Sequence, residues 1–186
     1  NMLWGGRAHY ASDVLPRSRT FQQYGDQIEQ CLQACKKHGL EVHVWKVNWN
    51  LSGAPADFVR KVHAEHRNQV SVDGQAHDWL CPSNPDNQRL ELASMLEVAQ
   101  NYDVDGLHFD YIRYPDRTKC YCDGCRQRCE PHRGSEVKDW PQTCYSGELQ
   151  AEYTQWRCDQ ITQLVKAVHE QAKRRRPSIQ ISAAVF

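Results

Sequence analysis

One stretch constrains the fold of this 186-residue chain more than any other: DVDGLHFDYIRYPD, from Asp103 to Asp116. Its apolar run is too short for a helix and is bounded by turn-forming residues, which is typical of a buried strand. Because alternate residues of a strand share a face, we predict two sets of side chains: Leu107, Phe109 and Tyr111 on one face, and His108, Asp110 and Ile112 on the other. Helices are expected to cover the first set, which is wholly apolar or aromatic.

A charge on the inward face of a sheet or barrel is costly unless it is paired, so Asp110 is expected to have a specific task. One interpretation makes Asp110 the catalytic carboxylate of a site at the end of the strand. The alternative is a structural carboxylate that pairs with Arg113 or caps the following turn. Asp103 and Asp105 precede the strand and are interpreted as turn or capping residues.

Three further strand-like runs alternate with helical patterns, and this alternation predicts βα units with a parallel sheet. The runs are Asn1 to Gly6, Glu41 to Trp49 and Ile179 to Phe186. Periodicity and capping signals predict helices over Phe21 to Gly39, near Ala56 to His66, from Pro85 onward with Asn84 as the cap, and from about Glu148 to Arg175. The long connections at 50–84 and 113–147 follow strand ends, where α/β sheets and barrels build sites.

The run EVHVWKVNW supplies further candidate binding residues. His43, Trp45 and Val47 are predicted on one face, with Lys46 and Asn48 on the other. A buried histidine bonded to a neighbour is one interpretation of His43, but a tryptophan near a barrel mouth also offers a stacking surface for a sugar. Beside Asp110 as the catalytic candidate, the predicted binding residues are His43, Trp45, Asn48, His108, Tyr111 and Arg113.

Charge and hydropathy exclude some partners. Lys plus Arg equals Asp plus Glu, 23 against 23, so no overall charge draws the chain to nucleic acid or an anionic membrane. No window approaches the roughly 20 apolar residues of a membrane span, and any targeting segment is expected outside these residues. With 40% hydrophobic and 25% charged residues, we expect a single globular domain over residues 1–186.

The connection at about 113–147 is rich in cysteine. CYCDGCRQRC places four thiols close together in sequence: Cys120, Cys122, Cys125 and Cys129. A C-x2-C pair is half of a common zinc site, and four thiolates would complete a structural site with no position open for chemistry. Disulfides that involve Cys144 or Cys81, or free thiols, are the alternative. In either case the expected role is to fasten the long loop beside the site.

Several segments resemble the bacterial glycosyl-hydrolase-like 10 domains. They are HGLEVHVWKVNW, WLCPSNPDNQ, NYDVDGLHFDYIRYPD, CYCDGC, the pair Trp156 and Arg157, and ISAAVF, and they span nearly the whole chain. The resemblance implies a (β/α)8 barrel that hydrolyses O-glycosidic bonds in a bacterial polysaccharide or cell-envelope glycan, with Asp110 on the fourth strand as the acid. It favours a secreted or cell-envelope location and requires no cofactor; the zinc considered above would be structural.

A full barrel needs about 250 residues and eight strands, whereas four strand-like runs are recognised here. The resemblance places them as the second to the fifth strand, which is roughly half of a barrel. Glycosidases ordinarily use two carboxylates, so this half alone can lack activity. Its open sheet edges are expected to pair two copies unless the native chain is longer. Two other functions stay open: a non-catalytic carbohydrate-binding barrel, and an interaction module stapled by metal at Cys120 to Cys129.

Overall fold

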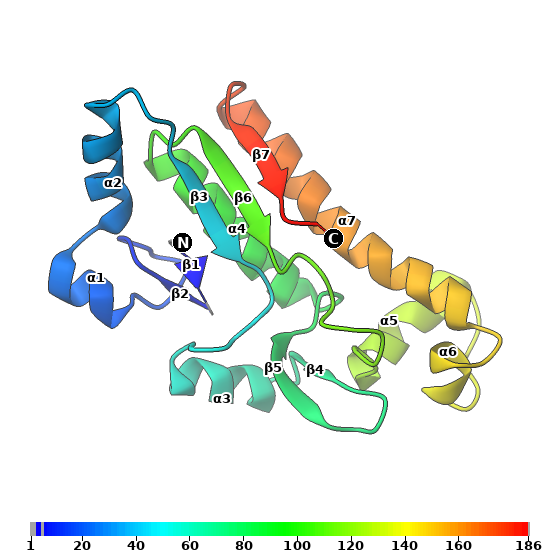
Figure 1. The fold of residues 1–186 in the computed structure, drawn as a ribbon. Coiled ribbons are helices and arrows are strands. Elements are labelled where there is room, and N and C mark those ends of the chain that lie inside the picture. The colour runs from blue at the N-terminus through cyan, green and yellow to red at the C-terminus, as the bar shows by residue number, and fades with distance from the viewer. Residues whose placement is uncertain (1–2, 5, 186) are drawn as a thin grey trace.

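A five-stranded sheet organises the computed structural model, which describes residues 3–4 and 6–185 (Figure 1). The strand order is β2-β1-β3-β6-β7; β1, β3, β6 and β7 are parallel, and β2 is antiparallel to β1. The strands of this sheet are β1 (Leu3–Trp4), β2 (Arg7–Ala8), β3 (His43–Val47), β6 (Gly106–Asp110) and β7 (Gln180–Ala183). A separate hairpin consists of β4 (Asn68–Val70) and β5 (Ala76–Leu80).

The helices are α1 (Arg19–Tyr24), α2 (Gln27–Lys36), α3 (Ala56–Ala64), α4 (Pro85–Asn101), α5 (Asp123–Arg133), α6 (Gln142–Tyr145) and α7 (Gln150–Arg175). The four parallel strands coincide with the four predicted runs, so the predicted α/β class is confirmed; the parts of the first and last runs at residues 1, 2, 5 and 186 lie outside the described residues. Within the described ranges, no helix has both the length and the apolar character needed to cross a bilayer.

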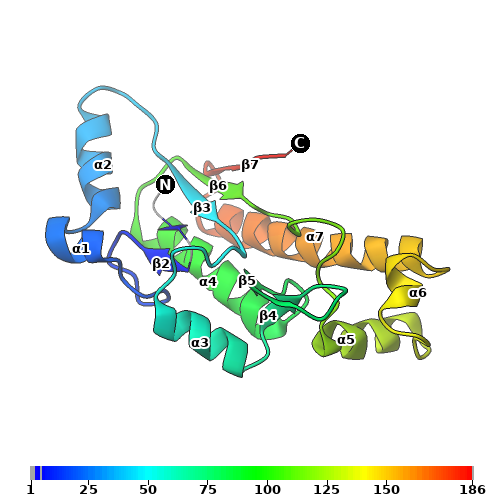
Figure 2. The same ribbon diagram turned by 60° about the horizontal axis from the view of Figure 1, so that its bottom comes forward.

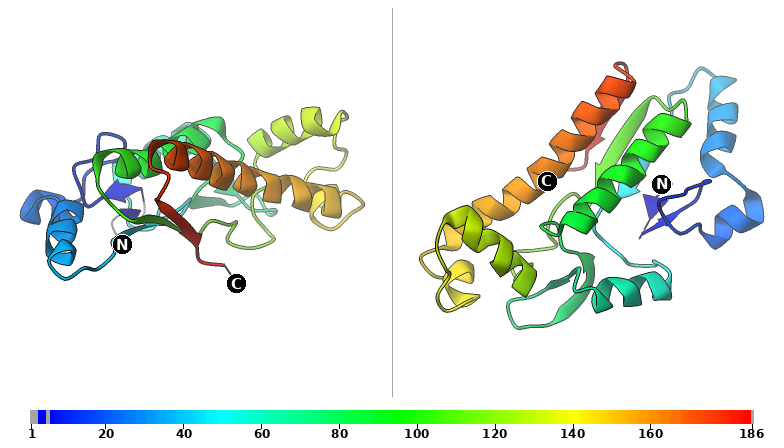
Figure 3. Two further views of the ribbon diagram at one scale, coloured as in Figure 1. Left: turned by 90° about the horizontal axis from the view of Figure 1, so that it is seen from above. Right: turned by 180° about the vertical axis from the view of Figure 1, so that it is seen from behind.

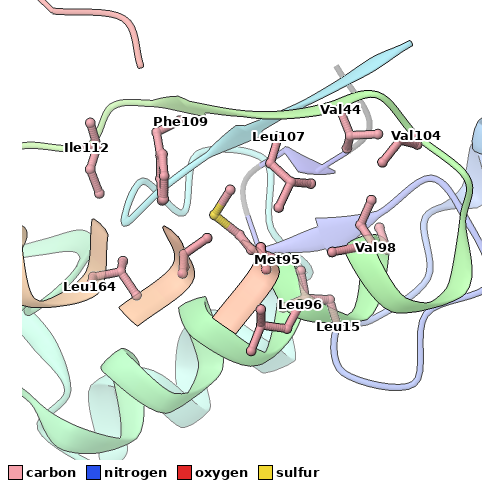
Figure 4. Close-up of a cluster of buried hydrophobic side chains, with 14 of the residues drawn as sticks. Leu15, Val44, Met95, Leu96, Val98, Val104, Leu107, Phe109, Ile112 and Leu164 are labelled. Atoms are coloured by element: carbon pink, nitrogen blue, oxygen red, sulfur yellow. The ribbon is translucent and has the colours of Figure 1, made fainter. Parts of the chain in front are cut away.

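Helices α4 and α7 lie side by side over one face of the sheet (Figures 2 and 3). Between them and the sheet, Leu107 and Phe109 of β6 meet Met95 of α4 and Leu164 of α7 (Figure 4). Each of these four side chains is at most 1% exposed. Since full burial of such a side chain stabilises a fold by about 1.5–3 kcal/mol, this layer holds β6 firmly against the helices.

The predicted alternation holds along β6 but stops at Asp110. Ile112 was expected to share the face of Asp110, and this was wrong, because Ile112 joins the helix-covered core with 9% exposure (Figure 4). The cause is Tyr111, whose φ of 53° lies in the left-handed region and ends the two-residue period of the strand. Tyr111 itself leaves the apolar face and packs beside Trp79, with 5.7 Å between ring centroids.

Capping side chains decide where the helices begin. Helix α4 begins where predicted, because Asn84 Oδ1 accepts hydrogen bonds from the backbone N–H groups of Asp86 (2.9 Å) and Asn87 (3.3 Å). The single helix predicted over 21–39 is instead two helices. Gly25, with a φ of 77°, ends α1, and Asp26 caps α2 through Oδ1.

The two long connections are ordered rather than irregular. The first contains α3 and the β4–β5 hairpin, and the second contains α5 and α6. Beyond the end of β6, the hairpin, α5, α6 and the first half of α7 enclose a second buried cluster (Figure 1). Its buried members are Cys81, Cys120, Tyr121, Cys122, Cys125, Cys129, Val137, Cys144, Leu149, Tyr153 and Trp156. At the margins of the described sheet lie β2 and β7; the expected pairing of two copies through open edges stays a prediction.

Candidate active site

The sheet face opposite α4 and α7 carries polar and aromatic side chains from three adjacent strands. Trp45 of β3 and His108 of β6 are register partners, and their rings meet edge to face with 6.2 Å between centroids. His108 in turn lies opposite Ser182 of β7, with 2.9 Å between Nδ1 and Oγ. Trp45 is 39% exposed, so this face is open to a ligand in the described structure.

Asp110 is the last residue of β6 and is partly exposed. The strand period places it on the open face, two residues beyond His108. Its Oδ1 accepts a hydrogen bond from the backbone N–H of Tyr111 at 2.8 Å, which agrees with the turn-capping interpretation. An ionised carboxylate has about four acceptor sites, so this one bond leaves Asp110 able to contact a ligand as well.

His43 lies at the other end of the same face. It is the register partner of Gly106, and a Cβ at Gly106 would come within 2.2 Å of His43 Nδ1, so the absence of a side chain there makes room for the imidazole. His43 Nε2 is 3.1 Å from Glu41 Oε2. Asp110 lies four residue steps along the strand from Gly106, which is about 13 Å at 3.3 Å per residue. His43 is therefore not grouped with Asp110.

Two strained aromatic residues follow the ends of adjacent strands. Trp49, just after β3, has a φ of 63°, and Tyr111, just after β6, has a φ of 53°. Such backbone costs about 1–3 kcal/mol per residue and concentrates at functional sites. The β5 strand supports both, because Leu80 N–H donates to the Trp49 carbonyl at 2.7 Å and the Trp79 ring packs on Tyr111. The guanidinium of Arg113 lies 5.4 Å from the Tyr111 ring centroid.

Asn48, a predicted binding residue, is fully buried on the side of the helices. Its Nδ2 donates to Oε2 of Glu91 on α4 at 2.5 Å, and Lys46 Nζ bonds the same oxygen at 2.7 Å. The Lys46 and Glu91 side chains are only 3% and 4% exposed. Alternation places Lys46 and Asn48 together, as predicted, but it directs both into the layer beneath the sheet, so Asn48 supports the site from behind.

The loop after β6 is braced by Arg157 of α7. The Arg157 guanidinium lies 4.3 Å from the ring centroid of Tyr114, and Nη2 donates to the Asp116 carbonyl at 3.1 Å. Burial raises the pKa of the Tyr114 phenol well above its usual value. Arg157 thus fixes the start of the loop next to Asp110, which gives Arg157 of the Trp156 and Arg157 pair a structural role.

The structure brings together three of the four predicted metal ligands, and the fourth thiol of the group is Cys81. The Sγ atoms of Cys81, Cys120, Cys122 and Cys125 all lie within 4.8 Å of one another, and all four residues are buried. Cys129 is buried too, but in another part of the second cluster. Hydrogen bonds from Cys120, and then from Cys122 and Cys125, hold the pKa of the Cys81 thiol well below its usual value.

Solved structures of glycoside hydrolases share this fold. The glycoside hydrolase domain of PgaB (BpsB) from Bordetella bronchiseptica matches 97% of the chain and 50% of its own length, with a TM-score of 0.70 and 14% identity. The α-L-fucosidase isoenzyme 2 from Paenibacillus thiaminolyticus matches 96% of the chain and 25% of its own length, with a TM-score of 0.66 and 12% identity. These likenesses confirm the fold as part of a TIM barrel.

Curated relatives are also longer than this chain. An S-layer-related protein of Niallia circulans is 27% identical over 161 residues, which are 76% of the chain and 10% of the relative. The glycosyl hydrolase YngK of Bacillus subtilis (strain 168) is 22% identical over 174 residues, which are 87% of the chain and 30% of the relative. The sequence matches the family described as glycosyl hydrolase-like 10 over residues 2–186. The chain therefore belongs to the glycosyl hydrolase-like 10 family.

Proposed function

We propose that this chain forms part of an O-glycoside hydrolase that acts on a bacterial polysaccharide or cell-envelope glycan, with Asp110 as a reacting carboxylate. The observation that carries the proposal is the position of Asp110: it lies at the carboxyl end of β6, on the open face that Trp45 and His108 share. Active sites of TIM-barrel enzymes lie at this end of the strands. Membership of the family and an S-layer-related relative support the reaction class and the envelope location.

The side chains around Asp110 suit a sugar ring. Trp45 offers an exposed indole face for stacking, and His108 offers a ring nitrogen for a sugar hydroxyl. At the rim, the Tyr111 ring, which the strained turn after β6 moves off the apolar face of the strand, packs in a tilted arrangement beside Trp79, and the Arg113 guanidinium lies 5.4 Å from the Tyr111 ring centroid. This group and the open face are the proposed subsite; His43 is too far along the strand to contact the same sugar, and Asn48 is buried.

Hydrolysis of a glycosidic bond ordinarily requires two carboxyl groups. In the proposal, Asp110 either protonates the leaving oxygen or attacks the anomeric carbon. We expect the second carboxylate on another strand of the barrel, because four parallel strands are described here and the chain matches only 25–50% of the two solved glycoside hydrolases. The test therefore uses the complete protein encoded by the native gene.

The experiment measures release of reducing ends from bacterial glycans by the complete protein and its Asp110→Asn variant. Asn preserves the shape of the side chain but cannot transfer a proton or act as a nucleophile, so turnover is expected to fall by about 10²–10⁴-fold or more. Asp103→Asn is the matched control, because this aspartate precedes the same strand and its side chain is fully exposed. Wild-type turnover by Asp110→Asn would contradict the assignment.

The exposed Trp45 also favours a second candidate, a carbohydrate-binding barrel without hydrolytic activity. Both candidates predict weaker glycan binding by Trp45→Ala, by roughly tenfold if one stacking contact of about 1.4 kcal/mol is lost. They differ in turnover. Glycan binding that depends on Trp45, with no cleavage by the wild-type protein, would favour the binding module.

A further inference from the structure

We propose that Cys81, Cys120, Cys122 and Cys125 bind one structural zinc ion, which fastens the end of β5 to the loop between β6 and α5. The sequence spacing suggests a zinc site with Cys129 as the fourth ligand; the structure assigns that position to Cys81, 39 residues before Cys120. The zinc site lies beside the proposed sugar subsite, but the proposal rests on the four sulfur atoms and their surroundings and does not depend on glycan hydrolysis.

The spacing of the sulfur atoms fits a tetrahedral metal site. Cys125 Sγ lies 3.5 Å from the Sγ atoms of both Cys81 and Cys122, and these two are 3.8 Å apart. Four thiolates around zinc at about 2.3 Å form a tetrahedron with sulfur–sulfur edges of about 3.8 Å. A disulfide requires about 2.05 Å. All nine cysteines lie among the described residues and are free thiols, so the arrangement fits metal coordination better than disulfide bonding.

Hydrogen-bond donors surround the four sulfur atoms. The backbone N–H of Val70 donates to Cys120 Sγ at 3.4 Å, and Ser83 Oγ lies 3.2 Å and 3.3 Å from the Sγ atoms of Cys81 and Cys125. The guanidinium of Arg128 donates to Ser83 Oγ at 3.0 Å and comes within 3.9 Å of Cys81 Sγ. Zinc with four thiolates carries a net charge of −2, and such donors stabilise it.

Helix α5 provides a second reason for thiolates at this place. Cys122 is the N-cap of α5, yet its side chain makes no capping hydrogen bond, and Cys125 lies in the first turn. The positive end of a helix dipole favours an anionic sulfur. The Cys122 side chain is thus placed to serve the group of sulfur atoms rather than its own helix.

The part of the fold around this group has few aliphatic side chains in its core. Of the eleven buried residues in the second cluster, six are cysteines and three are aromatic, and the aliphatic members are Val137 and Leu149. A small unit with few buried aliphatic side chains commonly relies on a metal for stability. Zinc at the four sulfur atoms would join the hairpin, the loop after β6 and α5 into one body, and this body carries Trp79 and Tyr114 at the edge of the proposed site.

Metal analysis of the purified chain, expressed with zinc and kept reduced, tests the proposal. We expect about one zinc per chain, and cobalt substitution is expected to give the charge-transfer and d–d bands of a tetrahedral tetrathiolate. Cys129→Ser is the matched control: it is buried and belongs to the same sequence motif, and it should leave metal content and cobalt spectrum unchanged. Cys81→Ser should weaken zinc binding at least tenfold and alter the cobalt bands.

Two further measurements keep the test decisive if Cys81→Ser fails to fold. X-ray absorption of the zinc-loaded wild-type chain is expected to show four sulfur ligands at about 2.3 Å. Cys81→His keeps a ligand and is expected to retain zinc with three sulfurs and one nitrogen. Zinc-free folded protein, iron in place of zinc, four sulfurs retained in Cys81→His, or loss of zinc in Cys129→Ser but not in Cys81→Ser would each overturn the proposal.

Discussion

Lys46→Met should destabilise this fold far more than a surface lysine change, because it leaves the Glu91 carboxylate buried without its cation. The Lys46 and Glu91 side chains are 3% and 4% exposed and 2.7 Å apart, and Asn48 would remain as a donor to Glu91. Removing one partner of a buried ion pair typically costs 3–5 kcal/mol. We therefore expect a loss of roughly 3–5 kcal/mol in the free energy of unfolding.

Urea denaturation of the purified chain measures this loss. With a slope of about 2 kcal/mol/M, the expected change lowers the urea midpoint by about 1.5–2.5 M. The double variant Lys46→Met with Glu91→Gln removes the buried charge and keeps an acceptor for Asn48, so it should recover at least about 2 kcal/mol of the loss. Lys61→Met is the control, because its ion pair with Glu65 spans 3.9 Å at the surface and should contribute under about 1 kcal/mol.

A midpoint change below about 0.5 M urea for Lys46→Met would show that the Glu91 carboxylate is not left buried and unpaired. A double variant no more stable than the single one would show that an unpaired charge is not the cause of the loss. In the first case, Glu91 would have found solvent or another donor. In the second, the cost would come from lost packing of the lysine side chain rather than from an unpaired charge.

Two further predictions concern helix α4 and the loop after β6. Asn84→Ala removes the side-chain cap of α4 and should lower the free energy of unfolding by about 1 kcal/mol, whereas a change within error in urea denaturation would rule out a stabilising cap. For Asp116, burial opposes ionisation, but hydrogen bonds from Thr118 and Lys119 outweigh it and lower the pKa from 3.8 to about 2. Its contribution to stability should therefore be present above about pH 4 and fade toward pH 2, so acid titration should show the wild-type chain and Asp116→Asn converging over that range; a pH-independent difference would argue against this linkage.

Local signals were enough to predict much of the fold. The four strand-like runs and the start of α4 at Asn84 could be recognised from short stretches of sequence, because apolar periodicity and capping depend on residues that are close together in the chain. The β4–β5 hairpin was missed, although Asp73 and Gly74 form a turn signal between its strands, with a φ of 82° at the glycine. The hydrophobic alternation around that turn is weak, so the pattern alone did not identify the strands.

Two long-range contacts and one unusual backbone conformation explain what the sequence could not show at the site. Cys81 meets the cysteine motif only because the hairpin folds back against α5, and no spacing rule connects residues so far apart. The position of Ile112 depends on the left-handed turn at Tyr111, a conformation that bulky residues rarely adopt. The burial of Asn48 depends on Glu91 of α4, which the strand pattern does not reveal.

Turnover by Asp110→Asn in the complete native protein shows whether the Asp110 carboxylate takes part in glycosidic bond cleavage. Two substrates are compared: the natural glycan and an aryl glycoside of the same sugar with a leaving group that needs no protonation. We expect a loss of turnover of about 10²–10⁴-fold or more on the natural glycan, with binding retained. Activity kept on the aryl glycoside would identify Asp110 as the acid, and loss on both would identify it as the nucleophile or the general base. Cleavage of the natural glycan at the wild-type rate would contradict a reacting role for Asp110.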